Sequence, residues 1–343
     1  MTEFNNVLPP GKVPGILLAE LLHRLPIPGS RILIGPGMGR DSAAIQIGDS
    51  VMVVKSDPIT FPTDRAAHHL IHINANDIAC QGATPRWLLV TALLPHGTTT
   101  PATVAKLFTE LQESAAEIGV ELIGGHTEIT LGLDRPLLVG TMIGETSVDR
   151  LVDPARAQPG DRLLMTKCAG IEGTAILATE LRSALVDGHG VCVETIEAAT
   201  KMIEFPGISI LKEAMVLSTG NFASALHDPT EGGIASAVWE LASAAGCGAL
   251  ISRDSIAVAP ETQAISDALG IDPLGLLASG SLLAAIPAQL LQAAELALTS
   301  AGIPWAWIGK LTPAETGIRL RSGSAVQDLP EFTVDEVARI LAG

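Results

Sequence analysis

The stretch Asn76-Asp77-Ile78-Ala79-Cys80-Gln81-Gly82-Ala83-Thr84-Pro85 lies at the end of a helix that we predict over residues 65–82. Asn74, Asp77 and Gln81 fall on one face of that helix, because they are spaced three and four residues apart. A solvated helix face is one explanation. The surrounding residues are apolar, however, and burying an unpaired carboxylate is costly unless a metal ion offsets the cost. The stretch therefore predicts a partly buried acidic site.

Three further acidic motifs stand in a fixed order around this stretch. They are Gly39-Arg40-Asp41-Ser42-Ala43-Ala44, Lys55-Ser56-Asp57-Pro58 and His227-Asp228-Pro229-Thr230-Glu231-Gly232-Gly233. Each places an aspartate beside a glycine, a small residue or an expected helix start. Mg²⁺ prefers oxygen ligands and usually binds through a few carboxylates together with substrate phosphates. The order of motifs therefore predicts a metal–nucleotide site assembled from distant segments.

Two of these aspartates also have ordinary structural explanations. Asp57 precedes a proline, and Asp-Pro is common in turns. Asp228 could cap a helix, because a proline and a glutamate follow at the first and third helical positions, as in a capping box. Capping leaves Gly232 and Gly233 unexplained, since glycine weakens a helix. They favour a close approach of the backbone to an anion at the helix N-terminus.

Two glycine-containing segments are further candidates for phosphate binding. Gly170-Ile171-Glu172-Gly173-Thr174 lies between an expected strand and an expected helix, although turn glycines are the more common explanation. Gly124-Gly125-His126-Thr127-Glu128 is expected to follow a strand. Its histidine could be a metal ligand, a base, a phosphate contact or a turn residue bonded to backbone, and its glutamate is an alternative base. Residues 35–40 lack the GxGxxG spacing, and no GxxxxGK[ST] motif occurs, so neither a Rossmann nor a P-loop site is expected.

Length and composition limit the class of protein. With 343 residues the chain is long enough for two domains. Lys and Arg number 21 against 37 Asp and Glu, a net charge of −16, which argues against binding nucleic acid or anionic membranes. We expect no signal peptide, because residues 1–6 lack a basic region followed by an apolar run. We expect no membrane span in the apolar stretch 274–298, which is interrupted by Pro287. The four cysteines form no CxxC pair, so a cytoplasmic location is expected.

Periodicity predicts mixed helices and strands along the whole chain. Strands are expected at 51–54, 87–94, 121–123, 137–143 and 162–166, and helices at 103–118, 174–185 and 234–245. The helix over 103–118 should bury one face, made of Val104, Leu107, Phe108, Leu111, Ala115 and Ile118. Residues 154–160 read as a linker. We therefore expect an α+β protein with domains at 1–153 and 154–343.

Taken together, the ordered motifs resemble the AIR synthetase-related (PurM-like) superfamily over nearly the whole chain. The set is GxDxAA, an aspartate ending a strand, residues 76–85, Gly-Gly-His-Thr and Asp-Pro-Thr-Glu-Gly-Gly, and it is most similar to the HypE-like branch. The resemblance implies a two-domain PurM-like fold. Its N-terminal domain would dimerise through its sheet, and its C-terminal domain would be α/β. ATP would bind in the cleft between the domains, near the dimer interface.

The resemblance also implies a set of site residues. Mg²⁺ would be held by Asp41, Asp57 and Asp77, with Asp228 as a further candidate. With the glycine turns included, the nucleotide-binding residues would be Lys12, Gly39, Ser42, Asn76, Gly124, Gly125, Thr127, Gly170, Gly173, Gly232 and Gly233. The catalytic residues would be His126 and Asp228.

The implied activity is transfer of the γ-phosphoryl group of ATP to an amide or carboxyl oxygen of a small substrate, which makes that oxygen a leaving group. Two alternatives remain open. One is a small-molecule kinase similar to thiamin-monophosphate kinase; the other is a non-catalytic nucleotide-binding dimer that assists a partner protein in hydrogenase metallocofactor maturation. The sequence departs from the pattern in two places. Its last residues, 339–343, contain no cysteine to carry a substrate, so reaction on its own tail is not expected, and Arg40 stands where the kinases favour an aspartate.

Overall fold

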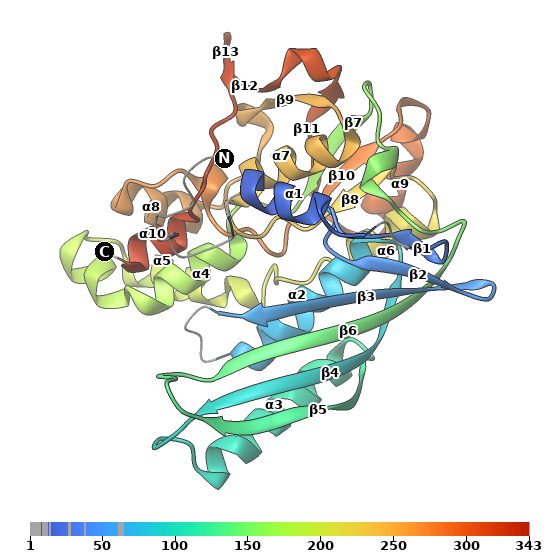
Figure 1. The fold of residues 1–343 in the computed structure, drawn as a ribbon. Helices are drawn as coiled ribbons and strands as arrows, with labels where there is room; N and C mark the ends of the chain where they lie inside the picture. Colours follow the sequence, from blue (N-terminus) through green and yellow to red (C-terminus); the bar gives the residue numbers. More distant parts are fainter. Residues whose placement is uncertain are drawn as a thin grey trace.

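The computed structural model describes residues 8, 13, 15–26, 29–37, 39–60 and 65–342. Its strands form two sheets, one from each half of the chain (Figure 1). The first sheet has six strands in the order β1-β2-β3-β6-β4-β5. Their bounds are β1 Ile32–Ile34, β2 Ala43–Ile47, β3 Ser50–Ile59, β4 Thr84–Pro95, β5 Glu121–Thr130 and β6 Leu137–Ser147. The predicted strands of this half are therefore confirmed, and each is longer than its sequence pattern indicated.

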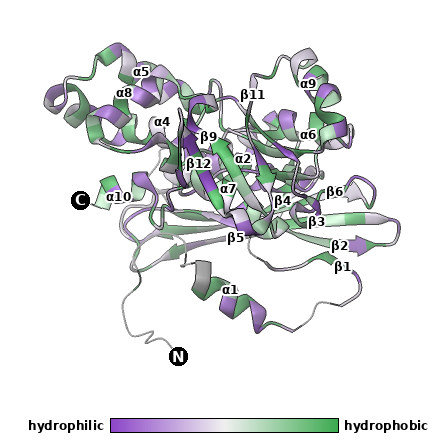
Figure 2. Ribbon diagram, turned by 90° about the horizontal axis from the view of Figure 1, so that it is seen from above, coloured by the Kyte–Doolittle hydropathy of each residue, from purple (hydrophilic) through white to green (hydrophobic). Residues whose placement is uncertain are grey.

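Two helices pack on one face of the first sheet. They are α2 (Ala66–Cys80) and α3 (Pro101–Glu117), and both helices were predicted. Helix α2 is buried along almost its whole length, because it lies between the first sheet and the second domain (Figures 1 and 2). The predicted buried face of α3 is wrong at Phe108, which is 51% exposed. The other predicted residues do face the core: Leu111 and Ala115 are buried in it, and Val104, Leu107 and Ile118 pack against it.

The second sheet has seven strands in the order β13-β12-β9-β11-β7-β10-β8. Their bounds are β7 Arg162–Thr166, β8 Ala225–His227, β9 Gly248–Ser252, β10 Leu283–Ile286, β11 Trp305–Thr312, β12 Ile318–Ser322 and β13 Ala325–Asp328. Among these described strands only β9 and β12 pair in parallel. The predicted strand over 162–166 is confirmed at both ends. The sheet lies in a mixed α+β domain.

Helices pack on both faces of the second sheet and form a separate cluster beside it. They are α4 Ile171–Glu180, α5 Val193–Thr200, α6 Leu211–Thr219, α7 Gly233–Ala245, α8 Pro260–Leu269, α9 Leu291–Ser300 and α10 Glu336–Ala342, while α1 Gly15–His23 precedes the first sheet. The helices predicted over 174–185 and 234–245 correspond to α4 and α7, and α4 begins and ends earlier than expected. In the described part of the chain, no helix is both long and apolar enough to cross a membrane.

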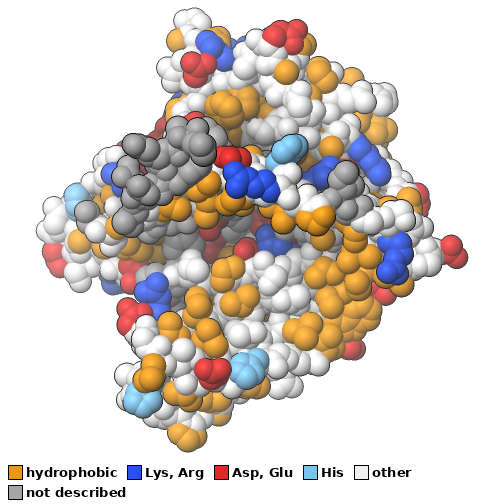
Figure 3. All heavy atoms as spheres, viewed as in Figure 1, with side chains coloured by type: hydrophobic (Ala, Val, Ile, Leu, Met, Phe, Trp, Pro, Cys, Tyr) orange, Lys and Arg blue, Asp and Glu red, His pale blue; other side chains and the backbone are white. Residues whose placement is uncertain are grey.

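The other face of the first sheet turns away from α2 and α3. Along β4 the side chains alternate, so that Leu88, Val90 and Ala92 are buried against the helices, while Leu89 and Leu93 remain partly exposed on the open face. Hydrophobic side chains gather over this face in the lower half of Figure 3. Helices cover only one face of this sheet, so the exposed apolar side chains of the other face form a surface suited to binding a second protein.

Candidate functional site

An acidic cluster forms where β3 meets α2. Strand β3 alternates, so Lys55 and Asp57 follow Val51 and Val53 on the face that contacts α2. Helix α2 brings Asp77 to the same place. Lys55 Nζ lies 2.9 Å from Asp77 Oδ2 and 3.8 Å from Asp57 Oδ2. The predicted metal ligands Asp57 and Asp77 are therefore neighbours, and they share one ammonium group.

The charges in this cluster are strongly coupled. Burial raises the pKa of Asp77 to about 7, with Asp41 and Asp57 adding to the shift and Lys55 opposing it. Burial alone would lower the pKa of Lys55, but Asp77, Asp57 and Asp41 outweigh it and raise that pKa above its usual range. Lys55 is therefore charged at neutral pH, and it compensates carboxylates that would otherwise repel one another.

Asp228 belongs to the same region and is not a helix cap. Helix α7 begins at Gly233 after the N-cap Gly232, with no side-chain cap, so the capping-box explanation is wrong. Asp228 instead follows β8, is 2% exposed and accepts a hydrogen bond from Asn76 Nδ2 at 2.9 Å. Burial raises its pKa well above the usual value, and Asp77 adds to that shift. Its Oδ1 is buried without a hydrogen-bond partner among the described residues. A buried carboxylate oxygen without a hydrogen-bond partner is suited to coordinate a cation.

Asn76, a predicted nucleotide contact, joins the two domains. It is fully buried in α2 and donates to Ile208 O as well as to Asp228. Its Oδ1 accepts a hydrogen bond from Ile210 N at 2.9 Å. These three bonds satisfy its amide group within the protein. Asn76 thus holds Asp228 against the N-terminal domain.

The Gly39–Ala44 motif reaches the cluster from the loop before β2. Asp41 Oδ2 lies 2.8 Å from His227 Nδ1, and Glu240 Oε2 lies 2.8 Å from His227 Nε2. Burial would lower the pKa of His227, but the two carboxylates outweigh it and raise that pKa well above its usual value. Gly39 has a positive φ of 67° and an added Cβ would lie 2.4 Å from Glu240 O, so only glycine fits there.

Sequence reasoning assigned no role to three of these side chains. Lys55, His227 and Glu240 compensate or orient the predicted aspartates. The position of Lys55 could have been predicted, because Lys55 and Asp57 are two residues apart in β3 and therefore point to the same face of the sheet. No local pattern links Glu240 to His227, since the pair forms only when α7 packs beside β8. Ser42 Oγ also contacts the cluster, 3.4 Å from Asp77 O.

The two predicted glycine turns begin helices of the second domain. Gly170 and Gly232 are N-caps in the left-handed conformation, at α4 and α7. Gly173 and Gly233 sit inside them, where an added Cβ would approach Leu276 and neighbouring backbone within 2.6 Å. The amide of Gly232 donates to Asp335 Oδ2 at 2.8 Å, in the position expected for a phosphate. Close packing accounts for Gly173 and Gly233, and their role in phosphate binding stays a prediction.

The sequence predicts that the Gly124–Glu128 motif follows a strand. In the structure the motif lies within β5, the exposed edge strand of the first sheet. The pairings Asp57–Gly140, Gly140–Val90 and Val90–Gly125 place Asp57 and Gly125 in one row across the sheet. Three strand spacings separate them, about 14 Å. His126 pairs with Thr91 on the open face, and its Nε2 lies 3.1 Å from Glu128 Oε2.

Within one chain, the β5 motif is therefore separate from the acidic cluster. A ligand bound at Asp57 could reach Gly124, Gly125, His126 and Thr127 of the same chain only if it spans this gap. Otherwise a second copy of the chain would have to supply these residues. Lys12 lies outside the described residues. The cluster itself offers the oxygen donors that suit Mg²⁺, and the unpaired Oδ1 of Asp228 adds to them.

Comparison with known proteins agrees with this architecture. Residues 39–146 match the family model described as AIR synthase related protein, N-terminal domain, and residues 158–320 match the corresponding C-terminal domain. A putative hydrogenase expression/formation protein of Methanocaldococcus jannaschii is 29% identical over 80% of this chain and 80% of its own length.

Two HypE proteins are also similar to the chain. The carbamoyl dehydratase HypE of Escherichia coli is 28% identical over 80% of this chain and 79% of its own. The crystal structure of E. coli HypE superimposes with a TM-score of 0.68 over 82% of this chain and 87% of that one, at 25% identity. The structure of a HypE in complex with ATP superimposes with a TM-score of 0.70 over 89% and 92% of the two chains, at 23% identity.

Proposed function

The chain belongs to the AIR synthase-related family, and we propose that it is a Mg²⁺- and ATP-dependent enzyme that phosphorylates an amide or carboxyl oxygen of a small substrate. The observation that carries the proposal is the convergence of Asp41, Asp57, Asp77 and Asp228 on one partly buried region between the two domains. The relatives named carbamoyl dehydratase support the amide, since dehydration of an amide requires its oxygen to leave.

In this proposal the four aspartates would hold Mg²⁺ when ATP is bound. The ion would supply charge neutralisation on the phosphoryl group in transfer. Lys55 keeps the carboxylates together before the nucleotide binds, because its ammonium group lies within 4 Å of both Asp57 and Asp77. The hydrogen bond from Asn76 holds Asp228 against the first domain, so residues of both domains contribute to one binding surface for the nucleotide. Burial of Asp77 and Asp228 excludes water, which strengthens each charge interaction.

The reaction forms a bond between the substrate oxygen and the γ-phosphorus and breaks the bond from that phosphorus to the bridging oxygen, which releases ADP. An amide that then loses its phosphorylated oxygen and its N–H protons becomes a nitrile, and inorganic phosphate is released. His126 and Asp228 remain our candidates for proton transfer. Asp228 is the better placed within one chain, because burial raises its pKa and its Oδ1 is unpaired among the described residues.

We further propose that the enzyme is a cytoplasmic homodimer whose domains divide at residues 153 and 154. The open face of the first sheet supports the dimer, because it carries partly exposed Leu89 and Leu93 with no cover from the described part of the chain. A dimer through that face would bring the β5 motif of one copy near its partner. A hydrogenase-maturation partner protein also fits the names of the relatives.

Oxygen-18 labelling and phosphorus NMR test this function. The purified protein is incubated with Mg²⁺, ATP and primary amides, carboxylates or alcohols that carry ¹⁸O on the candidate oxygen. Amide activation predicts ADP and ¹⁸O in the inorganic phosphate. A kinase instead keeps the label in a stable phosphoester. Inorganic phosphate that takes its oxygen from water in every reaction would contradict the proposal.

Two variants make the test specific. Asp57→Asn removes one proposed ligand and should lower turnover at least 100-fold. Asp49→Asn is the matched control, because Asp49 lies in the exposed turn between β2 and β3 and should leave turnover unchanged. Equal turnover of the wild type and Asp57→Asn would reject the acidic cluster as the site.

A further inference from the structure

A second cluster of metal-ligating side chains lies on the other half of α2. His68 and His72 are four residues apart and therefore share a face of the helix. Glu117, the last residue of α3, meets them there. One ligand atom from each of the three side chains lies within 4.8 Å of the other two. His72 Nε2 is 3.7 Å from Glu117 Oε2.

His72 supplies an independent sign of a ligand. Its side chain is 7% exposed, and neither of its ring nitrogens has a hydrogen-bond partner among the residues that the structure describes. Buried polar atoms almost always have a partner, because leaving one unpaired costs the full desolvation of that group. A metal ion on Nε2 would satisfy such an atom.

The other two side chains are placed as metal ligands usually are. The rings of His68 and His72 are 4.2 Å apart between centroids and tilted by 52°, so they do not stack flat against each other. The Glu117 side chain is 60% exposed and can turn by the small amount that coordination needs.

We propose that His68, His72 and Glu117 bind a divalent first-row transition metal, of which Zn²⁺ is the best fit. Two imidazoles and one carboxylate are common zinc ligands, at about 2.0–2.2 Å from the ion. Ligand atoms of a tetrahedral site then lie about 3.4 Å apart, close to the 3.7 Å between His72 and Glu117. Three protein ligands leave one position for water or a small ligand.

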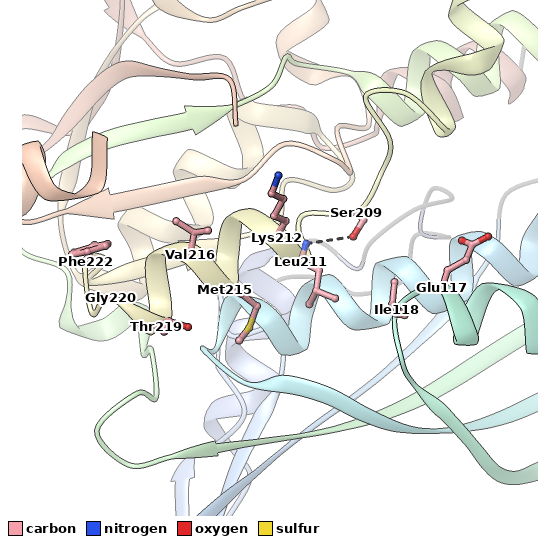
Figure 4. A pocket seen from close by; sticks show the side chains of 10 residues that line it. All are labelled: Glu117, Ile118, Ser209, Leu211, Lys212, Met215, Val216, Thr219, Gly220 and Phe222. Atoms are coloured by element: carbon pink, nitrogen blue, oxygen red, sulfur yellow. Dashed lines mark hydrogen bonds between the residues drawn. The ribbon is translucent and has the colours of Figure 1, made fainter. Parts of the chain in front are cut away.

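An entry path to the site exists. Glu117 and Ile118 also line an open groove of about 810 Å³, whose other wall is formed by residues of the segment 209–222 around α6 (Figure 4). The labelled side chains of Figure 4 show Glu117 at one end of this groove and Phe222 at the other. A hydrated ion can therefore reach Glu117 from solvent.

This site is distinct from the acidic cluster. His72 and Asp77 are five residues apart on α2, a rise of about 7.5 Å along the helix axis. The ligand chemistry also differs, because imidazole nitrogen favours transition metals such as Zn²⁺, whereas a site made of carboxylate oxygens alone favours Mg²⁺. The inference does not rest on the proposed function.

Calorimetric titration of the full chain with ZnCl₂ tests the proposal. Excess Mg²⁺ occupies oxygen-only sites. A phosphine reductant keeps the thiols reduced, and a blank titration of Zn²⁺ into the same buffer subtracts its own metal binding. One Zn²⁺ per chain should bind, and Co²⁺ in its place should give visible d–d absorption of a tetrahedral ion. Saturating Zn²⁺ should also raise the melting temperature, because it binds the folded chain preferentially.

Glu117→Gln and His68→Gln should each weaken Zn²⁺ binding at least tenfold and abolish the Co²⁺ spectrum. Glu113→Gln on the same helix and His189→Gln on an exposed loop are the matched controls and should change neither. Glu117 is mostly exposed, so its variant should fold even if changes at buried His72 do not. Absence of stoichiometric Zn²⁺ binding, or binding that survives both ligand variants, would overturn the proposal.

Discussion

Lys55 Nζ lies 2.9 Å from Asp77 Oδ2, and this ion pair is the electrostatic centre of the acidic cluster. Both side chains are largely buried, at 16% and 4% exposed. An ion pair of this kind contributes little net stability by itself, but removing one partner leaves an uncompensated buried charge.

Lys55→Met should therefore lower the free energy of unfolding by about 3 kcal/mol at pH 8. The loss should be smaller at pH 5. Without Lys55 the pKa of Asp77, already raised to about 7, rises further, so the carboxyl is neutral in the folded variant at low pH. Urea denaturation at the two pH values measures both effects. Lys106→Met is the control, because Lys106 is 72% exposed. A loss no greater than that of the control would show that the ammonium does not compensate the cluster.

Glu172 should make stability depend on pH. It is 1% exposed, and burial raises its pKa to about 7, with Glu231 adding to the shift. The folded state then binds more protons than the unfolded state between pH 4.5 and 7. Stability from this group therefore falls as pH rises through that window, by up to about 1.4 kcal/mol per pH unit.

Glu172→Gln should remove this slope and raise the melting temperature at pH 8. Calorimetric melts of both proteins between pH 5 and 8 provide the measurement. Identical pH profiles for the wild type and the variant would mean that Glu172 ionises normally.

Asn76→Ala should uncouple the domains. It removes three buried hydrogen bonds to Ile208, Ile210 and Asp228, at about 1 kcal/mol each. We expect a loss of about 3 kcal/mol and a raised KM for ATP. Asn74→Ala is the comparison, because Asn74 bonds only within the first domain, mainly to Leu70 O. Equal effects of the two variants on KM would argue against a bridging role for Asn76.

Leu89→Glu should convert the proposed dimer into monomers. The side chain lies on the open face of the first sheet, and a carboxylate there would be desolvated in an apolar interface. Light scattering after size-exclusion chromatography measures the mass. Leu296→Glu changes an equally apolar side chain that is 68% exposed on α9, and it should leave the mass unchanged. A wild-type monomer, or a dimer unaffected by Leu89→Glu, would exclude this interface.

The sequence predicted those features that depend on local spacing. The alternation of β3 and the periodicity of α2 determine which face Asp57 and Asp77 occupy, and these faces meet as soon as the helix packs on the sheet. The order of acidic motifs also indicated the family and the two-domain fold. Local signals failed where a residue is satisfied by a distant partner. Asp228 matched a capping box, yet its carboxylate bonds to Asn76.

Tertiary structure alone decided how the motifs are distributed. Strand order places β5 three strands from β3, so Gly125 lies about 14 Å from Asp57 and His126 lies on the other face of the sheet. Packing within the second domain brings Glu240 to His227 and Asp335 to the amide of Gly232. Packing of α3 against α2 within the first domain carries Glu117 to His68 and His72. Periodicity fixes the face of each element, whereas long-range contacts fix which faces meet, and no spacing along the chain encodes those contacts.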